Sequence, residues 1–377
     1  MKNLHIGILG TRGIPNRYGG FEQFAEKLAA GLVQKGMSVT VYNASRHPWK
    51  QRQWGEVRIV HRYEPPGWLG AAGQFLYDLA CLLHARRAGF DVLLVLGYTS
   101  NSIWSFLYPS DAQVVLNMDG WEWKRSKYPH WVRCFLLFSE KVAVRHCNLT
   151  VADSPVIQEY LAQRYGIAAH YIPYGADTGG SDDADVLRLY ALEQKEYYLL
   201  IARMVPENNI ATILEGLSGR EQHRSVLIIS DMNTAYGKSI LVRFGNNKNF
   251  RFTGAIFDTH ILYNLRKHCR LYFHGHSVGG TNPSLLEAMA ACAPVCAHDN
   301  PFNRVVLGED ACYFDSAGDI RMRIAGKFHE QVQHAMCMRN LDKIYQQYNW
   351  PRIIDQYAVL FNLSCQPVHE RKIAYTG

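Results

Sequence analysis

The chain has 377 residues, of which 48% are hydrophobic and 19% charged, and its formal net charge is +7. This length predicts two domains, and the composition is that of a globular protein with full hydrophobic cores. The modest positive charge permits an anionic substrate or membrane surface. It is too small and too dispersed to indicate a nucleic acid partner.

The cysteine and hydropathy patterns indicate a reducing compartment. The nine cysteines are scattered, and none has zinc-ligand spacing. The N-terminal apolar run is too short for a signal peptide, and the longest uncharged run, Val92–Ser110, is interrupted by Gly97, Asn101 and Pro109. We therefore expect a cytoplasmic protein, either soluble or peripheral on the inner face of the cytoplasmic membrane.

The first half of the chain alternates short apolar segments with segments of helical spacing, which predicts a doubly wound parallel sheet. The expected strands are Leu4–Leu9, Ser38–Asn43, Val57–Arg62, Asp91–Leu96, Gln113–Asn117, Leu149–Asp153 and His170–Pro173. The expected helices are Phe21–Lys35, Gln74–Arg87, Trp131–His146 and one from Pro155 onward. In the first helix, Phe21, Phe24, Leu28 and Leu32 should face the core.

The predicted helix Gln74–Arg87 is rich in leucine and ends in two arginines. Such a helix could touch a membrane surface or a lipid acceptor. We favour the alternative, a core helix whose basic end complements its dipole.

Two groups of glycines stand in and after the first strand. Gly7, Gly10 and Gly13 match a dinucleotide fingerprint poorly, and Asn43 stands where an acidic ribose ligand is needed, so we expect a Rossmann-like fold without a dinucleotide. The pair Gly19-Gly20 precedes a helix, where its amides could face a diphosphate. A simple turn is the alternative for that pair.

A polar segment, Met118–Arg125, follows the strand Gln113–Asn117. Groups just past the carboxyl end of a parallel strand are well placed for a cleft. Asp119 is the best carboxylate candidate in this half, with a loop acid that caps the next turn as the alternative.

After a linker, Tyr174–Asp185, the alternation restarts and predicts a second doubly wound domain. The expected strands are Glu196–Ala202, Ser225–Ser230, Phe250–Thr253, Leu271–Phe273, Pro294–Ala297 and Ala311–Phe314. The expected helices are Asn208–Leu217, Asp258–Lys267 and one starting near Asn282 or Pro283. We expect a last helix after Trp350-Pro351 to cross back and pack on the first domain, and residues 366–377 to be a mobile tail.

The segment His274–Met289, HGHSVGGTNPSLLEAM, combines a glycine-rich turn with a helix start. Asn282 suits an N-cap and Pro283 the first helical turn. Loop amides and the helix N-terminus favour a phosphate, and Glu287 could accept hydrogen bonds from sugar hydroxyls. A plain strand–turn–helix with a solvated Glu287 is the alternative.

Two cations stand out in this half, Arg203 and Lys267. Arg203 is better placed, because it lies at the end of a strand and its guanidinium can bind a diphosphate with two hydrogen bonds. Alternatively, Arg203 pairs with Glu207.

On the basis of these segments, the chain resembles family 4 glycosyltransferases of the GT-B fold, and most closely a branch of bacterial rhamnosyltransferases. The matching segments are Gly10–Glu22 (GTRGIPNRYGGFE), Asn117–Lys127, Ala202–Ile210 and Gly279–Met289. The resemblance implies an acceptor-binding domain, residues 1–177 plus the C-terminal helix 350–365. It also implies a nucleotide-sugar-binding domain, residues 178–349, and a cleft between the two.

The resemblance also implies roles for single residues. Asp119, Arg203 and Glu287 are the expected catalytic residues: Asp119 beside the sugar, Arg203 on the leaving group and Glu287 on the ribose. The expected donor-binding residues are Gly19, Gly20, Arg203, His276, Gly280, Thr281, Asn282 and Glu287. The expected acceptor-binding residues are Arg17, Tyr18, Trp121 and Glu122.

Two positions depart from the family pattern. Gly279 stands where family 4 enzymes often have a first glutamate, and His276 could substitute for it in contacts to the donor sugar. Asn208 stands at the place of a common lysine, which leaves one cation fewer for the diphosphate.

The implied activity is retaining transfer of a sugar without a metal or cofactor. The best match is L-rhamnose, moved from dTDP-rhamnose to a growing, lipid-linked glycan in bacterial cell-surface polysaccharide synthesis. Alternatives are a UDP- or GDP-sugar donor, or an epimerase or phosphorylase of the same fold. A dinucleotide-dependent oxidoreductase and a non-catalytic glycan- or membrane-binding protein are further alternatives.

Overall fold

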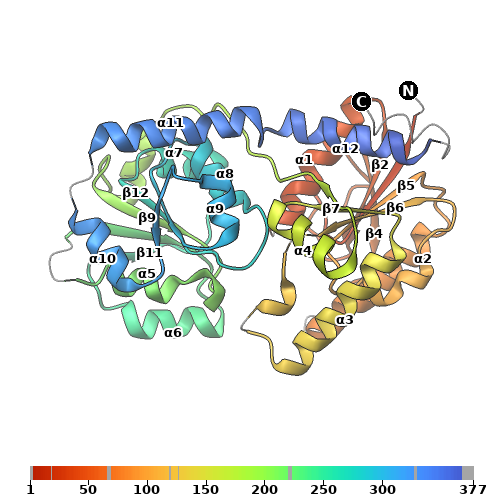
Figure 1. The fold of residues 1–377 in the computed structure, drawn as a ribbon, viewed down its shortest axis with the longest axis horizontal. Helices are drawn as coiled ribbons and strands as arrows, with labels where there is room; N and C mark the ends of the chain where they lie inside the picture. The colour runs from red at the N-terminus through yellow and green to blue at the C-terminus, as the bar shows by residue number, and fades with distance from the viewer. Residues whose placement is uncertain are drawn as a thin grey trace. The chain divides into compact units, whose positions relative to one another are not determined.

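The computed structural model describes residues 3–17, 19–65, 69–118, 120–125, 127–219, 223–326 and 329–366. Tyr18, Asp119 and the predicted tail beyond Gln366 lie outside the described residues. The chain divides into two compact units (Figure 1). Unit 1 comprises the chain up to Trp123, His130–Tyr174 and the chain from Trp350, and unit 2 comprises Lys124–Pro129 and Gly175–Asn349.

Unit 1 is built on a sheet whose described strands run in the order β3-β4-β2-β1-β5-β6-β7-β8. All neighbouring strands pair in parallel except β3, which is antiparallel to β4. The strands are β1 (His5–Leu9), β2 (Ser38–Ala44), β3 (Gln53–Trp54), β4 (Val57–Arg62), β5 (Val92–Leu96), β6 (Gln113–Met118), β7 (Leu149–Ala152) and β8 (His170–Tyr171). Continuous apolar runs such as that of β5, which is buried throughout, are typical of such central strands.

The helices of unit 1, apart from η3, each have buried residues. They are α1 (Gly20–Gln34), α2 (Ala71–Ala85), η2 (Ser102–Leu107), η3 (Glu122–Lys124), α3 (His130–His146), α4 (Pro155–Tyr165) and α12 (Trp350–Ser364). In α1, Phe24, Leu28 and Leu32 are fully buried, as their helical spacing predicts, whereas Phe21 is only partly buried.

The C-terminal helix α12 belongs to unit 1 and packs on α1. Gly31 of α1 leaves room for this contact, because a Cβ there would overlap Ile354. The Asn117 amide donates to the Tyr357 hydroxyl at 2.6 Å, so α12 is also bound to the end of β6. The last helix therefore completes the core of a unit that begins more than three hundred residues earlier.

Unit 2 has a parallel sheet in the order β11-β10-β9-β12-β13-β14. Its strands are β9 (Tyr197–Ile201), β10 (Ser225–Ile229), β11 (Phe250–Phe252), β12 (Leu271–His274), β13 (Val295–His298) and β14 (Cys312–Phe314). Its helices are η4 (Ala184–Tyr190), η5 (Pro206–Asn208), α5 (Ile210–Gly216), α6 (Ala235–Phe244), α7 (Thr259–Lys267), α8 (Pro283–Ala290), α9 (Pro301–Leu307), α10 (Ala317–Ala325) and α11 (Glu330–Gln346). The predicted pair of Rossmann-like α/β units is confirmed.

Some helices have other bounds than the sequence predicts, and others were not expected. The helix expected over Gln74–Arg87 begins earlier and ends at Ala85. No helix was expected over α6 or α11, whose exposed faces weaken the apolar periodicity that such predictions rest on. Within the described residues, no helix has both the length and the apolar character that a membrane span requires.

Candidate functional site

In unit 2, two loops meet at the carboxyl edge of the sheet. Strands β9 and β12 are neighbours and run in parallel, so the segments that follow them leave the sheet side by side. The first carries Arg203, and the second, Gly275–Asn282, carries His276 and the glycine pair Gly279-Gly280. This edge is where open α/β sheets bind their ligands.

The glycine-rich loop is fixed by hydrogen bonds from the segment after β9. Asn209 donates its side-chain amide to the Gly275 carbonyl at 2.8 Å, and the Ser277 hydroxyl donates to the Glu207 carbonyl at 2.8 Å. A Cβ at Gly275 would overlap the carbonyl oxygen of Asn208, so only glycine fits there. The two loops thus form one rigid unit.

Asn208 has a structural role in this contact. Its side chain is buried, and its amide donates to the Arg203 carbonyl at 2.8 Å. The position where the resembled family often carries a lysine therefore holds the arginine loop in place and offers no charge to a ligand.

His276 lies at the start of the loop, stacked on His274 with ring centroids 4.5 Å apart and an interplanar angle of 16°. Burial lowers the pKa of His276 to about 3, with further contributions from the cations Arg203 and Arg125. His274 is fully buried, and burial likewise holds its pKa well below the ordinary value. Both rings are therefore neutral at physiological pH.

The two imidazoles have unused hydrogen-bonding atoms. Nδ1 of His276 and both ring nitrogens of His274 are buried without a partner among the described residues. The carbonyl of His276 is bound by the side-chain amides of Asn300 and Asn303, at 3.1 Å each. The backbone is thus fixed, while the buried Nδ1 of the His276 ring keeps an unsatisfied hydrogen-bonding capacity.

Arg203 is exposed, and its guanidinium has no partner within the described part of the chain. The alternative pairing with Glu207 is wrong. Glu207 instead lies 3.5 Å from the guanidinium of Arg125, and both of these side chains are largely buried. The strand-end arginine is therefore available to bind an anion.

Helix α8 begins as the sequence predicts. The Asn282 side chain accepts a hydrogen bond from the Ser284 amide at 2.9 Å, with Pro283 in the first turn. This side-chain oxygen caps the helix, and the role of Asn282 in donor binding stays a prediction. Thr281 is buried, and Gly279 has a φ of 133° that disfavours any other residue.

Glu287 is not the solvated carboxylate of the alternative interpretation. It accepts a hydrogen bond from Arg266 of α7 at 2.5 Å, and the Arg266 side chain is only 4% exposed. Lys267, the other cation considered from the sequence, pairs with Asp182 at 3.0 Å. Adjacent helix positions point in different directions, so Arg266 reaches α8 and Lys267 does not.

In unit 1, the loop between β1 and α1 is held by acidic residues of the helix that follows. Glu22 accepts a hydrogen bond from the Arg12 amide at 2.9 Å, and Glu26 accepts one from the Asn16 amide at 2.5 Å. Gly19 is the N-cap of α1 and makes no side-chain cap, so the first amides of the helix after Gly20 keep their donor capacity.

Asn43 holds the loop between β1 and α1 in place. Its amide group donates to the Ile14 carbonyl at 2.7 Å and accepts from the Ile14 amide at 3.0 Å. The side chain is completely buried. The position that a ribose-binding acid occupies in dinucleotide enzymes is therefore used to fold the loop.

The expected acceptor residues belong to unit 1. Arg17 is exposed, and Trp121 and Glu122 are half-buried, with the Trp121 ring 5.7 Å from that of Tyr160. Tyr18 and Asp119 fall outside the described residues. The predicted cleft that would join these residues to Arg203 stays a prediction.

Sequence reasoning missed His274, Arg125 and Arg266. His274 reads as a strand residue, and only its stacking on His276 reveals a role. The charge of Arg125 was not singled out from its basic neighbours. Arg266 gives no local signal, because its contact with Glu287 forms only where α7 and α8 pack together.

Comparison with family models divides the chain at the same place as the fold. Residues 3–177 match a domain family of unknown function, and residues 188–327 match the family described as glycosyl transferases group 1. No curated protein matches the chain significantly.

Several solved structures share the fold of the whole chain. Sucrose-phosphate synthase from Thermosynechococcus elongatus superposes with a TM-score of 0.76 at 15% identity, covering 95% of this chain and 98% of that one. HepE from Anabaena, in complex with UDP-glucose, gives 0.72 at 14% identity, with 95% and 99% covered. A glycosyltransferase from Rickettsia africae gives 0.68 at 11% identity, with 97% and 100% covered. At such identities the likeness shows the fold.

Proposed function

We propose that this chain, whose residues 188–327 match the group 1 glycosyl transferase family and which shares its fold with solved glycosyltransferases, transfers a sugar from a nucleoside diphosphate to a glycan hydroxyl. The proposal rests mainly on Arg203, a cation with no partner among the described residues, at the carboxyl edge of β9. Beside it are a glycine-rich loop and the N-terminus of α8. A diphosphate fits such a combination of fixed positive groups.

Sugar transfer builds negative charge on the leaving diphosphate. Arg203 and the amides at the start of α8 offset this charge, and preorganised donors of this kind are usually the largest catalytic contribution. Because these groups belong to the protein, we propose that transfer needs no metal. We further propose that configuration at the anomeric carbon is retained, as in the family that the chain resembles.

His276 and Glu287 are proposed to bind the donor by hydrogen bonds. The neutral His276 ring can exchange a hydrogen bond with a sugar hydroxyl, and its burial keeps it neutral beside the cation Arg203. Glu287 is held by Arg266 at one oxygen, and the side chain remains 29% exposed, so a ribose hydroxyl can reach the carboxylate. Gly280 and Thr281 lie between them and offer backbone amides.

For the donor, dTDP-rhamnose is our first choice, because Gly10–Glu22 resembles the rhamnosyltransferase branch. The alternative donor is UDP-glucose, which is the ligand in the HepE structure. The acceptor is proposed to be a growing, lipid-linked glycan, bound through Arg17, Tyr18, Trp121 and Glu122. Asp119 is proposed to position the sugar or the acceptor, and Gly19 and Gly20 to contact the diphosphate.

A panel of nucleotides and nucleotide sugars tests the proposal by thermal shift and isothermal titration calorimetry. A donor at 100 times its Kd stabilises the fold by about 2.7 kcal/mol. Arg203→Gln removes charge-assisted hydrogen bonds and should weaken donor binding about tenfold to a hundredfold. The control Arg321→Gln, on the exposed side of α10, should bind as the wild type does. If no nucleotide sugar binds, or if Arg203→Gln binds equally well, the proposed site is wrong.

A further inference from the structure

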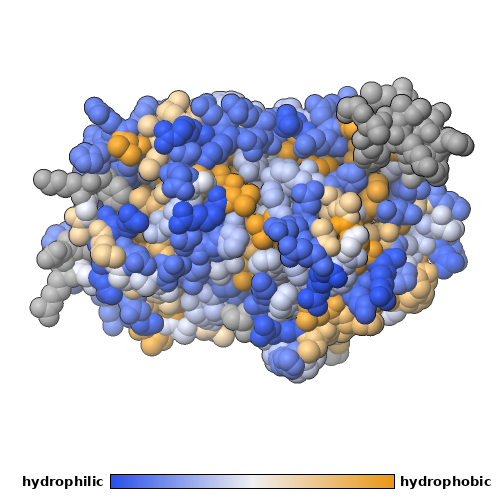
Figure 2. Space-filling model, viewed as in Figure 1, coloured by the Kyte–Doolittle hydropathy of each residue, from blue (hydrophilic) through white to orange (hydrophobic). Residues whose placement is uncertain are grey.

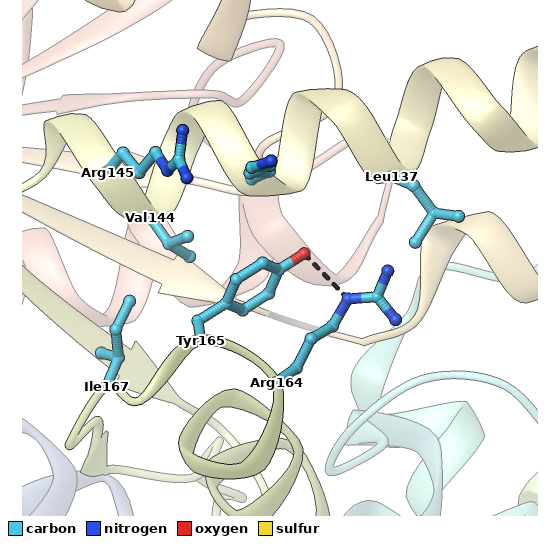
Figure 3. Close-up of a pocket in the computed structure, with 7 residues that line it drawn as sticks. Leu137, Val144, Arg145, Arg164, Tyr165 and Ile167 are labelled. Carbon is cyan, nitrogen blue, oxygen red and sulfur yellow. Dashed lines mark hydrogen bonds between the residues drawn. The ribbon is translucent and has the colours of Figure 1, made fainter.

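Unit 1 contains a cavity of about 520 Å³ between α3 and α4, and none of its lining residues is assigned to the donor site (Figure 3). Residues of α3, α4 and the segment after α4 line it. They are Leu137, Lys141, Val144, Arg145, Arg164, Tyr165 and Ile167. Three of the seven are cations and none is an acid, so the cavity suits an anion. We call this cavity the basic pocket.

The cations of the basic pocket are arranged for a ligand. Lys141 and Arg145 are exposed and one helical turn apart on α3, and neither has an ion-pair partner among the described residues. Like charges at this spacing repel each other in the absence of an anion between them. Arg164, on α4, has its guanidinium on the side of Leu137 in Figure 3 and donates to the Tyr165 hydroxyl at 3.2 Å.

The wall of the pocket is rigid. The Tyr165 and Tyr160 hydroxyls donate to the fully buried Glu140 carboxylate at 2.7 and 2.6 Å. The Arg164 guanidinium also lies over the rings of Tyr160 and Trp123, at 5.7 and 5.9 Å from the centroids. Glu140 supplies one negative charge beneath three cations, so the pocket keeps a net positive charge.

Large apolar side chains are exposed next to the basic pocket. On α3, Trp131 is 73% exposed and Phe138 is 58% exposed, on the same helix face as Lys141 and Arg145. Helix η2 packs against both α2 and α3. The neighbouring elements η2 and α2 add Phe106, Leu76 and Leu83. Figure 2 shows hydrophobic residues gathered at the lower edge of unit 1, where Figure 1 places α3.

We infer that this surface docks on a bilayer that contains anionic phospholipid, with a lipid phosphate in the basic pocket and the apolar side chains among the acyl chains. A phospholipid joins a phosphate to acyl chains covalently, so one molecule complements both features. Arginine binds phosphate oxygens in pairs, and tryptophan is favoured at the interface of a bilayer. The inference does not depend on the identity of the sugar donor.

Flotation of the full chain with vesicles tests this docking. Wild-type protein should float with phosphatidylcholine vesicles that contain phosphatidylglycerol and stay behind with pure phosphatidylcholine. Each cation removed should weaken the binding about fivefold, so Lys141→Gln with Arg145→Gln should weaken it roughly 25-fold. Trp131→Ser with Phe138→Ser should weaken it roughly tenfold or more.

The matched control is Lys238→Gln with Val242→Ser, which removes one exposed cation and one exposed apolar side chain from α6 in unit 2. It should float as the wild type does. The variant Lys141→Arg keeps the charge and should also bind, which separates loss of charge from loss of folding. All variants should keep the thermal response to the nucleotide sugar, so a failure here is distinguishable from a failure of the donor site.

Three outcomes would overturn the inference. The first is equal binding to vesicles with and without phosphatidylglycerol. The second is unchanged flotation of both double variants. The third is competition by soluble glycerol phosphate at the concentration of the lipid phosphate, which would show a site for a free phosphate and no docking surface.

Discussion

The pair Arg266–Glu287 predicts an unequal response to the loss of either partner. Its atoms lie 2.5 Å apart, but the Arg266 side chain is 4% exposed and that of Glu287 is 29% exposed. Glu287→Ala leaves a buried guanidinium without its counter-ion, which costs about 3 kcal/mol. Arg266→Met fills the space of the arginine and leaves a carboxylate that water can reach, so it should cost about 1 kcal/mol.

Hydrogen exchange measured by mass spectrometry can separate these values locally, on peptides from β12 and α8. A cost of about 3 kcal/mol should speed their exchange by about two orders of magnitude, and about 1 kcal/mol by roughly fivefold. The exposed pair Arg243–Glu215 on α6 and α5, 3.0 Å apart and about half-exposed on both sides, is the control. Either substitution there should cost less than about 1 kcal/mol.

The comparison between the two single variants decides the matter. If Arg266→Met destabilises α8 as much as Glu287→Ala does, burial of the arginine is not the source of the cost. In that case the helix contact would depend on packing, and Glu287 would not need a fixed charge partner to be positioned.

Two further predictions concern the glycine-rich loop. Gly275→Ala places a methyl group against the Asn208 carbonyl and should lower the free energy of unfolding by about 1–3 kcal/mol. The control Gly219→Ala, which has open space around it, should be tolerated. Equal melting temperatures of the two variants would contradict this prediction. Because the folded pKa of His276 lies below its unfolded value, its contribution to stability is complete above about pH 6.5 and is lost as the pH falls toward 3. His276→Phe should therefore lose less stability than the wild type in thermal melts between pH 7 and 5, and an unchanged loss would contradict the assignment.

Features that depend on neighbours in the chain could be predicted from the sequence. The buried face of α1 follows from the spacing of Phe24, Leu28 and Leu32, and the start of α8 follows from Asn282 and Pro283. Both arise within one or two helical turns, so the local sequence contains the required information.

Features that depend on distant contacts could not be predicted. Arg203 and Glu207 have the spacing of a helical ion pair, but the chain turns through η5 there and Glu207 contacts Arg125 instead. Arg266 and Glu287 are 21 positions apart and meet only because α7 and α8 pack together. Pairings of this kind are set by the tertiary arrangement, which periodicity does not encode.

The place of α12 in unit 1 has a consequence for synthesis of the chain. The apolar surface of α1 that receives Ile354 and Tyr357 is translated more than three hundred residues before the helix that covers it. Unit 2 can therefore fold while unit 1 still lacks α12. Unit 1 is thus begun before unit 2 and completed after it, so the apolar surface of α1 lacks its covering helix while unit 2 is being translated.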